Sequence, residues 1–193
     1  MATPPVFSAG AVLTAAQMNA IGLWEITPTS VAGTGVSLSG STVTVSSSTT
    51  ANINGCFTSD FDNYRIVIAQ FTTNTPQGIY LRLRTTTDAA GNDYSYGGIY
   101  RLFAGGGGDV SSNNVSSFVQ GTGSTTPDSG GTYDILSPNL AKHTQFVGNM
   151  LNFDAGVAIA GVHKLANAYT GFSILTTTGN TFSATIRIYG YRN

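Results

Sequence analysis

Histidine is the usual general base of a nucleophilic hydrolase, and this chain of 193 residues contains two. Such a site also needs an activated nucleophile and an acidic partner. Neither His143 nor His163 lies in a nucleophile-elbow context. Because a catalytic centre requires several such groups to converge, we expect both histidines to be hydrogen-bonded structural residues. The sequence therefore predicts no catalytic residue and a protein that is not an enzyme.

Acidic pairs are the next candidates for chemistry. Asp60 and Asp62 form an Asp-x-Asp pair whose oxygen atoms are of the type that binds calcium. No third or fourth ligand follows at a matching spacing, and aspartate is common in turns. Asp88, Asn92 and Asp93 are a similar case. We therefore expect turns at both places, with no bound metal and no other cofactor.

The glycine run Gly105–Gly108 invites comparison with a phosphate-binding loop. That loop needs a lysine and a serine or threonine after its glycines, at the start of a helix. Here Asp109 and Val110 follow instead. We expect a flexible loop from Gly105 through Asn114, and a second Gly-rich loop from Gly121 to Gly131.

Tyrosines on or near outward faces are the predicted contact residues. A tyrosine has a large apolar body and a polar tip, so it suits a subunit interface or a sugar ring. Subunit packing is favoured because the low charge of the chain already indicates buried surface. Glycan recognition would also use loops at one end of the domain, here the two Gly-rich ones. The tyrosines are Tyr94, Tyr96, Tyr100, Tyr189 and Tyr191.

The composition indicates a folded protein that associates. Charged residues make up 9% of the chain, against about 25% in a typical soluble protein, and the formal net charge is -1. A net charge near zero favours association. Aromatic residues at 10% exclude a disordered chain. Eight Lys and Arg against nine Asp and Glu, with no basic run, argue against nucleic acid as a partner.

Cysteine content and hydropathy limit the compartments in which the protein works. The single cysteine, Cys56, cannot form an internal disulfide. We find no basic segment followed by a long apolar one near Met1, and no stretch of about 20 apolar residues. We expect synthesis in a cytoplasm, without a membrane span.

Helix signals are concentrated before residue 22. Thr14 is a good N-cap with Gln17 three residues on, and Leu13 and Met18 are placed to form a hydrophobic staple. Gly22 is a suitable stop. A helix of about two turns is not stable alone in water, so it must dock on a partner. We expect residues 1–22 to form an attachment arm and residues 23–193 to form a β-domain.

From Trp24 onward the sequence alternates with period two, which is typical of strands. Residues 36–46 predict two short strands around Ser39-Gly40, or one strand with a bulge there, and Asn54-Gly55 is a hairpin signal. Residues 64–71 predict a central strand. Residues 78–85 predict a strand with one face buried and one face outward. Its buried residues are Ile79, Leu81 and Leu83, and its outward residues include Arg82 and Arg84. Further strands are expected near Phe118 and at 132–136, 145–153, 157–165, 171–177 and 182–191. About nine short strands predict a β-sandwich of jelly-roll type, with a partly closed barrel as the alternative.

The last two predicted strands read as a hairpin around Gly179-Asn180. A three-residue loop that includes Thr181 pairs Phe172 with Ile188 and Ile174 with Ile186, whereas a two-residue loop pairs Phe172 with Arg187. We expect the longer loop, because it keeps the apolar face of residues 182–188 in the core.

Three segments resemble the tail and fibre proteins of tailed bacteriophages. They are residues 7–19 (FSAGAVLTAAQMN), 61–68 (FDNYRIVI) and 186–192 (IRIYGYR), together less than a fifth of the chain. The resemblance implies a virion component, usually trimeric, with an attachment element before a β-domain. The residues that would make this attachment are Leu13, Thr14, Gln17, Met18 and Ile21.

The leading hypothesis is a tail or tail-fibre protein that assembles symmetrically and presents loops toward a host surface. The first alternative is a capsid decoration or head-fibre protein that stabilises the shell, and the second is a lectin-like carbohydrate-binding module. Expected partners are further copies of the chain, as a homotrimer, other virion proteins and host-surface carbohydrate. The expected location is the virion, after synthesis in the host cytoplasm.

Overall fold

The computed structural model describes residues 10, 22–123, 125, 129–177 and 179–191. The regular elements of this part of the chain are all strands, which confirms the all-β prediction. The predicted helix, with Leu13, Thr14, Gln17, Met18 and Ile21, lies outside the described residues. The strands are β1 (Trp24–Ile26), β2 (Ser30–Ala32), β3 (Val36–Ser39), β4 (Thr42–Ser48), β5 (Thr50–Asn54), β6 (Asn63–Thr73), β7 (Gln77–Arg84), β8 (Tyr94–Leu102), β9 (Gly107–Val115), β10 (Phe118–Gly123), β11 (Ser129–Leu136), β12 (Thr144–Leu151), β13 (Ala155–His163), β14 (Gly171–Thr176) and β15 (Phe182–Tyr191).

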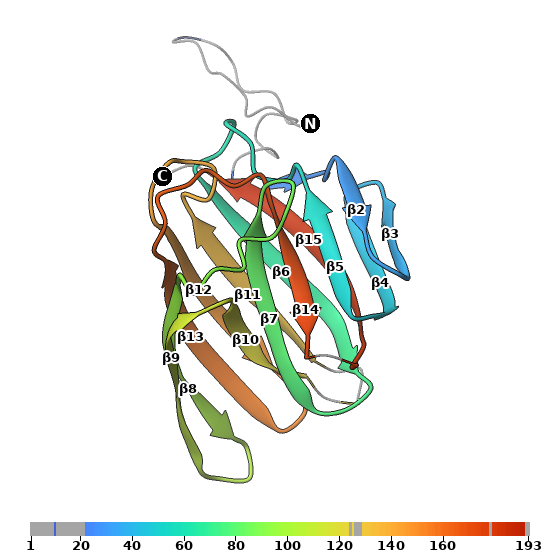
Figure 1. Cartoon of the computed structure of the whole chain (residues 1–193). Coiled ribbons are helices and arrows are strands. Elements are labelled where there is room, and N and C mark those ends of the chain that lie inside the picture. The colour runs from blue at the N-terminus through green and yellow to red at the C-terminus, as the bar shows by residue number, and fades with distance from the viewer. Residues whose placement is uncertain (1–9, 11–21, 124, 126–128, 178, 192–193) are drawn as a thin grey trace.

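These strands form two antiparallel sheets that pack face to face, as the sandwich prediction required (Figure 1). The large sheet has ten strands in the order β3-β4-β15-β6-β11-β12-β13-β8-β9, with β1 added beside β15. The small sheet has five strands in the order β10-β7-β14-β5-β2. The chain passes from one sheet to the other at almost every step from β4 to β8. This repeated crossing gives a sandwich of jelly-roll type.

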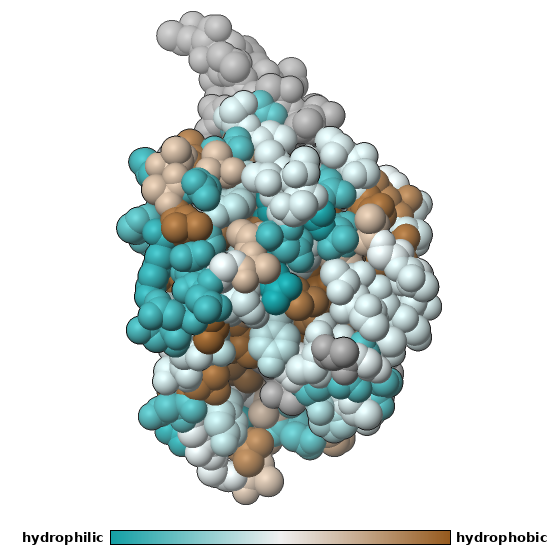
Figure 2. Space-filling model, viewed as in Figure 1, coloured by the Kyte–Doolittle hydropathy of each residue, from teal (hydrophilic) through white to brown (hydrophobic). Residues whose placement is uncertain are grey.

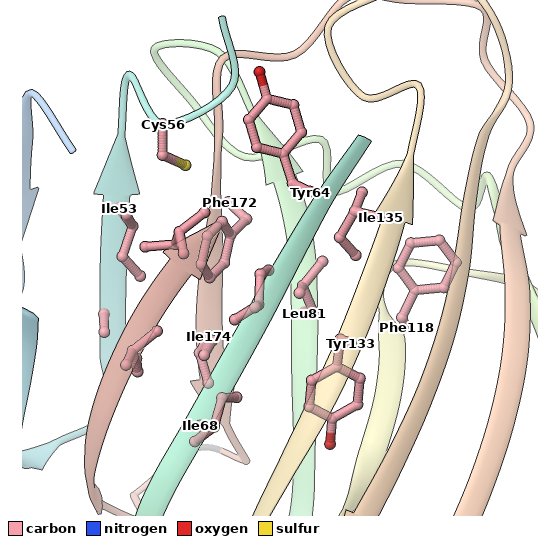
Figure 3. Close-up of a cluster of buried hydrophobic side chains, with 14 of the residues drawn as sticks. Ile53, Cys56, Tyr64, Ile68, Leu81, Phe118, Tyr133, Ile135, Phe172 and Ile174 are labelled. Atoms are coloured by element: carbon pink, nitrogen blue, oxygen red, sulfur yellow. The ribbon is translucent and has the colours of Figure 1, made fainter. Parts of the chain in front are cut away.

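The core lies between the two sheets and is built by alternation along the strands. In β12 and β15 every second residue faces inward and is buried. Figure 3 shows Leu81, Phe172 and Ile174 of the small sheet facing side chains of the large sheet such as Ile68, Tyr133 and Ile135. Aromatic rings continue this contact across the core, with the ring of Phe118 stacked 4.7 Å from that of Phe146.

Strand β15 lies in the interior of the large sheet, third from the β3 edge. It pairs along its whole length with β6, and its other edge is shared by β4 and β1. Phe182, Ala184, Ile186 and Ile188 are buried, which confirms the predicted core face. On the opposite face Arg187 reaches both neighbours: its Nε lies 3.3 Å from Thr42 Oγ1 in β4 and 3.9 Å from a carboxylate oxygen of Glu25 in β1.

The predicted C-terminal hairpin is wrong, because β14 and β15 belong to different sheets. Phe172 in β14 lies opposite Ile53 and Leu83, whereas Ile186 in β15 lies opposite Val43 and Ile68. Alternation fixes which face of a strand is buried, but it does not identify the partner strand. A sandwich buries the same two apolar faces by placing them on opposite sides of the core.

The two long Gly-rich loops are also shorter than predicted. Residues 107–115 form the edge strand β9, so the first loop shrinks to residues 103–106, and β10 and β11 extend into the second. A neutral edge strand lacks the apolar alternation that marks a strand in sequence. Asn54-Gly55 makes no hairpin, because Gly55, at φ 62°, begins the crossing from β5 to β6. The two strands around Ser39-Gly40 and the central position of β6 are confirmed.

Two neighbouring positions of β15 test the assignment of its faces. Ile186 is fully buried, so Ile186→Asp places an unpaired charge in the core and should lower the free energy of unfolding by more than about 3 kcal/mol. Arg187→Asp changes the exposed face and should cost less than about 1 kcal/mol. Urea denaturation followed by tryptophan fluorescence measures both. Equal losses in the two variants would contradict the assignment.

Candidate functional site

The antiparallel strands divide the connections between two ends of the sandwich (Figure 1). Strands β6, β8, β10, β12 and β14 all run toward the same end, which we call the cleft end. Connections at this end include residues 74–76, 103–106 and 152–154, and the described residues 177 and 179–181 between β14 and β15. The opposite end, which we call the terminal end, holds the start of β1 at Trp24, paired with Gly190 near the end of β15.

The connections of the cleft end form two groups, of which the first is polar. The backbone N–H of Asn74 donates to the Thr181 carbonyl (3.1 Å), and the N–H of Thr181 donates to Asn74 Oδ1 (3.0 Å). Thr177 Oγ1 donates to Gln77 Oε1 at 2.7 Å. These bonds tie the β6–β7 connection to the β14–β15 connection across the two sheets.

The second group carries two exposed aromatic side chains. The N–H of Phe103, in the β8–β9 connection, donates to the carbonyl of Asp154 in the β12–β13 connection (2.9 Å). Phe103 is 63% exposed and Phe153 is 62% exposed. Large apolar side chains gathered on adjoining loops indicate a binding surface.

A cleft of about 380 Å³ opens between these two groups, where the edges of the two sheets part. Figure 2 shows hydrophobic surface in the lower half of the molecule, beside the β8–β9 hairpin. Residues of β7 and β10 form one wall, and residues of β8, β9 and β13 form the other. The lining residues are Pro76, Gly78, Tyr100, Leu102, Val110, Val119, Gly123, Asn152, Asp154, Ala155 and Val157.

Tyr100 forms the aromatic part of the cleft wall because its cross-strand partner is a glycine. Gly108 in β9 lies opposite Tyr100 in β8. A Cβ atom at position 108 would lie 3.0 Å from Tyr100 Cε1 and 3.2 Å from Tyr100 Oη, which is closer than such contacts normally come. The missing side chain lets the phenol ring lie against β9. A function for the glycine run that sequence reasoning missed is therefore to make room for this ring.

Polar groups lie at the mouth of the cleft. Asn152 Oδ1 accepts the N–H groups of Asp154 (3.0 Å) and Ala155 (2.6 Å), which fixes the turn. Asp154 is exposed, and its carboxylate makes no ion pair within the described part of the chain. The turn thus presents a carboxylate beside apolar walls.

The five predicted contact tyrosines do not form one site. Tyr100 lines the cleft, and Tyr96 packs against the core. Tyr189 and Tyr191 lie half-buried on the outer face of the large sheet, where burial and nearby Asp134 raise the pKa of Tyr191 to about 12.

The prediction that Tyr94 lies on an outward face is wrong. Tyr94 is fully buried, its hydroxyl donates to the Ala89 carbonyl (2.8 Å) and accepts the N–H of Leu83 (3.0 Å), and burial raises its pKa. These two bonds link the start of β8 to the end of β7 and to the connection between them. The segment around Tyr94 contains several tyrosines, and their inward or outward direction depends on a strand register that spacing alone does not reveal.

Arg84 points to the outer face of β7, as predicted, but it is buried there. Its Nη1 donates to Ser173 Oγ (3.0 Å), its Nη2 donates to the Thr86 carbonyl (3.0 Å), and it forms an ion pair with Asp88 at 3.4 Å. This network holds the β7–β8 connection across the outer face of β14. The sequence did carry a signal for this ion pair, because Asp88 follows Arg84 by four residues at the end of the predicted strand. The role of Arg84 is structural.

The remaining candidates for chemistry do not converge on a reactive site. Asp60 accepts a hydrogen bond from Thr58 Oγ1 within its turn (3.2 Å). Within the described ranges no three His, Cys, Asp or Glu side chains lie close enough to hold a metal ion. In the same ranges no helix is long and apolar enough to cross a membrane.

His163 is buried, whereas His143 is exposed. The Nδ1 of His163 lies 3.2 Å from Tyr169 Oη, and the ring meets that of Tyr94 edge-on at 4.4 Å. Burial lowers the pKa of His163 because the charged imidazolium loses its solvation.

No family model matches the chain, and no curated protein matches it. Among solved structures it resembles a seed lectin of Lotus tetragonolobus, with 11% identity and a TM-score of 0.36, covering 87% of this chain and 96% of the lectin. It also resembles a lectin from Bauhinia forficata in complex with GalNAc, with 9% identity and a TM-score of 0.22, covering 85% and 97% of the two chains. These values assign neither a family nor a ligand.

The buried His163 predicts a specific dependence of stability on pH. The unfolded chain binds a proton at this residue below about pH 6.5, whereas the folded chain, in which the pKa is lowered, binds it only at a lower pH. The free energy of unfolding should therefore fall as the pH falls below about 6.5. His163→Phe should reduce this loss, and His143→Gln should leave it unchanged. Urea denaturation between about pH 7 and pH 5 measures the difference, and equal slopes in all three proteins would refute the assignment.

Proposed function

We propose that this chain is a non-enzymatic structural component of a tailed-bacteriophage virion, of the tail or tail-fibre type. In this proposal the terminal end faces the virion and the cleft end faces the host surface. The observation that carries the proposal is the position of the phage-like segments in the fold.

Two of the three phage-like segments meet at the terminal end. The segment 61–68 enters β6 and the segment 186–192 ends β15, with Tyr64 opposite Gly190. A Cβ atom at Gly190 would lie 2.4 Å from the ring of Phe61, so this glycine makes room for the ring. The ring of Trp24 packs 5.7 Å from Phe61 on the same end. The third segment, 7–19, precedes Trp24 in the sequence and, apart from Gly10, lies outside the described residues.

Neither of the two segments that the structure describes lines the cleft. The features that resemble a virion protein therefore gather where the described sandwich begins, and the exposed aromatic loops gather at the other end. This polarity is what a module needs if one end is anchored and the other binds. It favours tail presentation over capsid decoration, because a shell-stabilising protein has no need of an outward cleft.

Symmetric assembly is the second part of the proposal. The expectation of a trimer comes from the resemblance to phage tail and fibre proteins. The outer face of the large sheet exposes Ile99, Val147 and Leu151. Between them lie small residues such as Ala158, which pairs with Ile99 and Asn149. An apolar face with so little charge suits packing against another copy or another virion protein.

Location on the virion tests the anchoring part of the proposal. Gold-labelled antibody against the purified chain should bind the phage tail in electron micrographs. Deleting residues 1–21 should abolish incorporation while leaving the sandwich folded. Label on the capsid would favour the decoration alternative, and absence from virions would favour the free lectin-like module.

Association of the full chain tests the assembly part. Sedimentation equilibrium at micromolar concentration should show a trimer. Ala158→Arg places a long charged side chain in the middle of the exposed face and should weaken association at least about tenfold, a loss of about 1.4 kcal/mol. Ser37→Arg, on the exposed face of the short edge strand β3, is the matched control and should not change it. A monomeric wild-type chain, or equal effects of the two variants, would contradict the assigned face.

A further inference from the structure

We infer that the cleft binds a sugar residue that carries a methyl group, as an N-acetyl group or as the C6 methyl of a deoxyhexose. This inference rests on the proposed function, in which the cleft end contacts the host surface. It adds the chemical class of the ligand and the residues that select it.

The size and construction of the cleft fit one small ligand. Its volume of about 380 Å³ lies near the lower end of the usual range of about 300–1,000 Å³ for small-molecule sites. Strands of both sheets form its walls, so it exists before a ligand arrives. A preformed site avoids the entropy loss of ordering loops around the ligand.

The walls provide one aromatic surface and one aliphatic surface. The ring of Tyr100 offers a flat apolar face, against which the C–H face of a pyranose ring can pack. Val110, Val119 and Val157 come from β9, β10 and β13 and lie half-buried in the same cleft. A bare hexose would place hydroxyl groups against these valines and leave them without hydrogen bonds. A methyl substituent fills that part of the cleft without this loss.

The mouth provides the polar contacts. An ionised carboxylate only accepts hydrogen bonds, so Asp154 suits the hydroxyl donors of a sugar. Its negative charge repels sugars that carry a carboxylate, sulfate or phosphate. The inferred ligand is therefore a neutral sugar.

Phe103 and Phe153 extend the surface beyond the mouth. Both side chains are more than half exposed, on two connections joined by the Phe103–Asp154 hydrogen bond. This position suits the neighbouring residues of a longer glycan, whose ring faces also pack on aromatic side chains. A peptide is a less suitable occupant, because apart from the free edge of β10 the lining is mainly apolar and offers few polar groups to pair with its backbone.

Matched sugar pairs test the ligand class directly on the full-length protein. Isothermal titration should show N-acetylglucosamine binding more tightly than glucose, and L-fucose more tightly than L-galactose. Burying one methyl group predicts a difference of about fourfold. The pair that shows the larger difference distinguishes the N-acetyl source from the deoxy source.

Variants of the cleft test the assigned residues. Tyr100→Ala should weaken binding at least about tenfold, and Tyr100→Phe, which keeps the ring, should retain most of it. Tyr189→Ala removes a tyrosine from the outer face of the large sheet and should have no effect. Asp154→Asn changes an exposed residue, so it should weaken binding without affecting the fold even if Tyr100→Ala unfolds.

The outcomes separate this inference from the proposed function. Equal affinity within both sugar pairs, no binding of any of the four sugars at millimolar concentration, or preferential binding of an apolar peptide would overturn the inference. Unchanged affinity in Asp154→Asn and Tyr100→Ala would overturn the site. In each case tail labelling decides the proposed function independently, because location does not depend on which ligand the cleft takes.

Discussion

The sandwich depends on the burial of β15 between partners that come from the first 73 residues of the chain. This last strand pairs with β6 on one edge and with β4 and β1 on the other. Ile186 and Ile188 complete the core only after those strands have been brought together. The loop-closure entropy of such distant pairings must be overcome before burial compensates for it. The fold is therefore stabilised mainly by non-local apolar contact, with small contributions from surface ion pairs such as Arg187–Glu25.

The cleft follows from the unequal width of the two sheets. Strand β10 is the edge of the small sheet and lies opposite β12, β13 and β8. The large sheet continues through β8 to β9, and the β8–β9 hairpin extends past β10 (Figure 1). The inward faces of Tyr100 and Val110 consequently have no complete second layer over them. The same mismatch that leaves apolar surface uncovered also produces the binding cleft.

Sequence reasoning predicted the features that depend on local pattern. Alternation identified the all-β sandwich and the buried face of β15, because burial on one side of a strand leaves a period of two. The interior position of β6 was predicted from β-forming residues on both of its faces. It failed for the partner of β14, since Phe172 and Ile174 bury equally well across a sandwich as within a hairpin. It also failed for the direction of Tyr94 and for the burial of Arg84, because both depend on the path of the β7–β8 connection. Edge strand β9 was missed because Gly, Ser and Asn carry no apolar signal.

The central claim is that the sandwich is mounted with its terminal end toward the virion and its cleft end toward the host. Cryo-electron microscopy of the intact phage, at a resolution that separates strands, tests this claim most directly. The account predicts tail density in which Trp24 and Gly190 face the rest of the virion, while Phe103 and Phe153 point into solvent. Density in which the cleft end is buried against other virion proteins, with the terminal end outward, would contradict it.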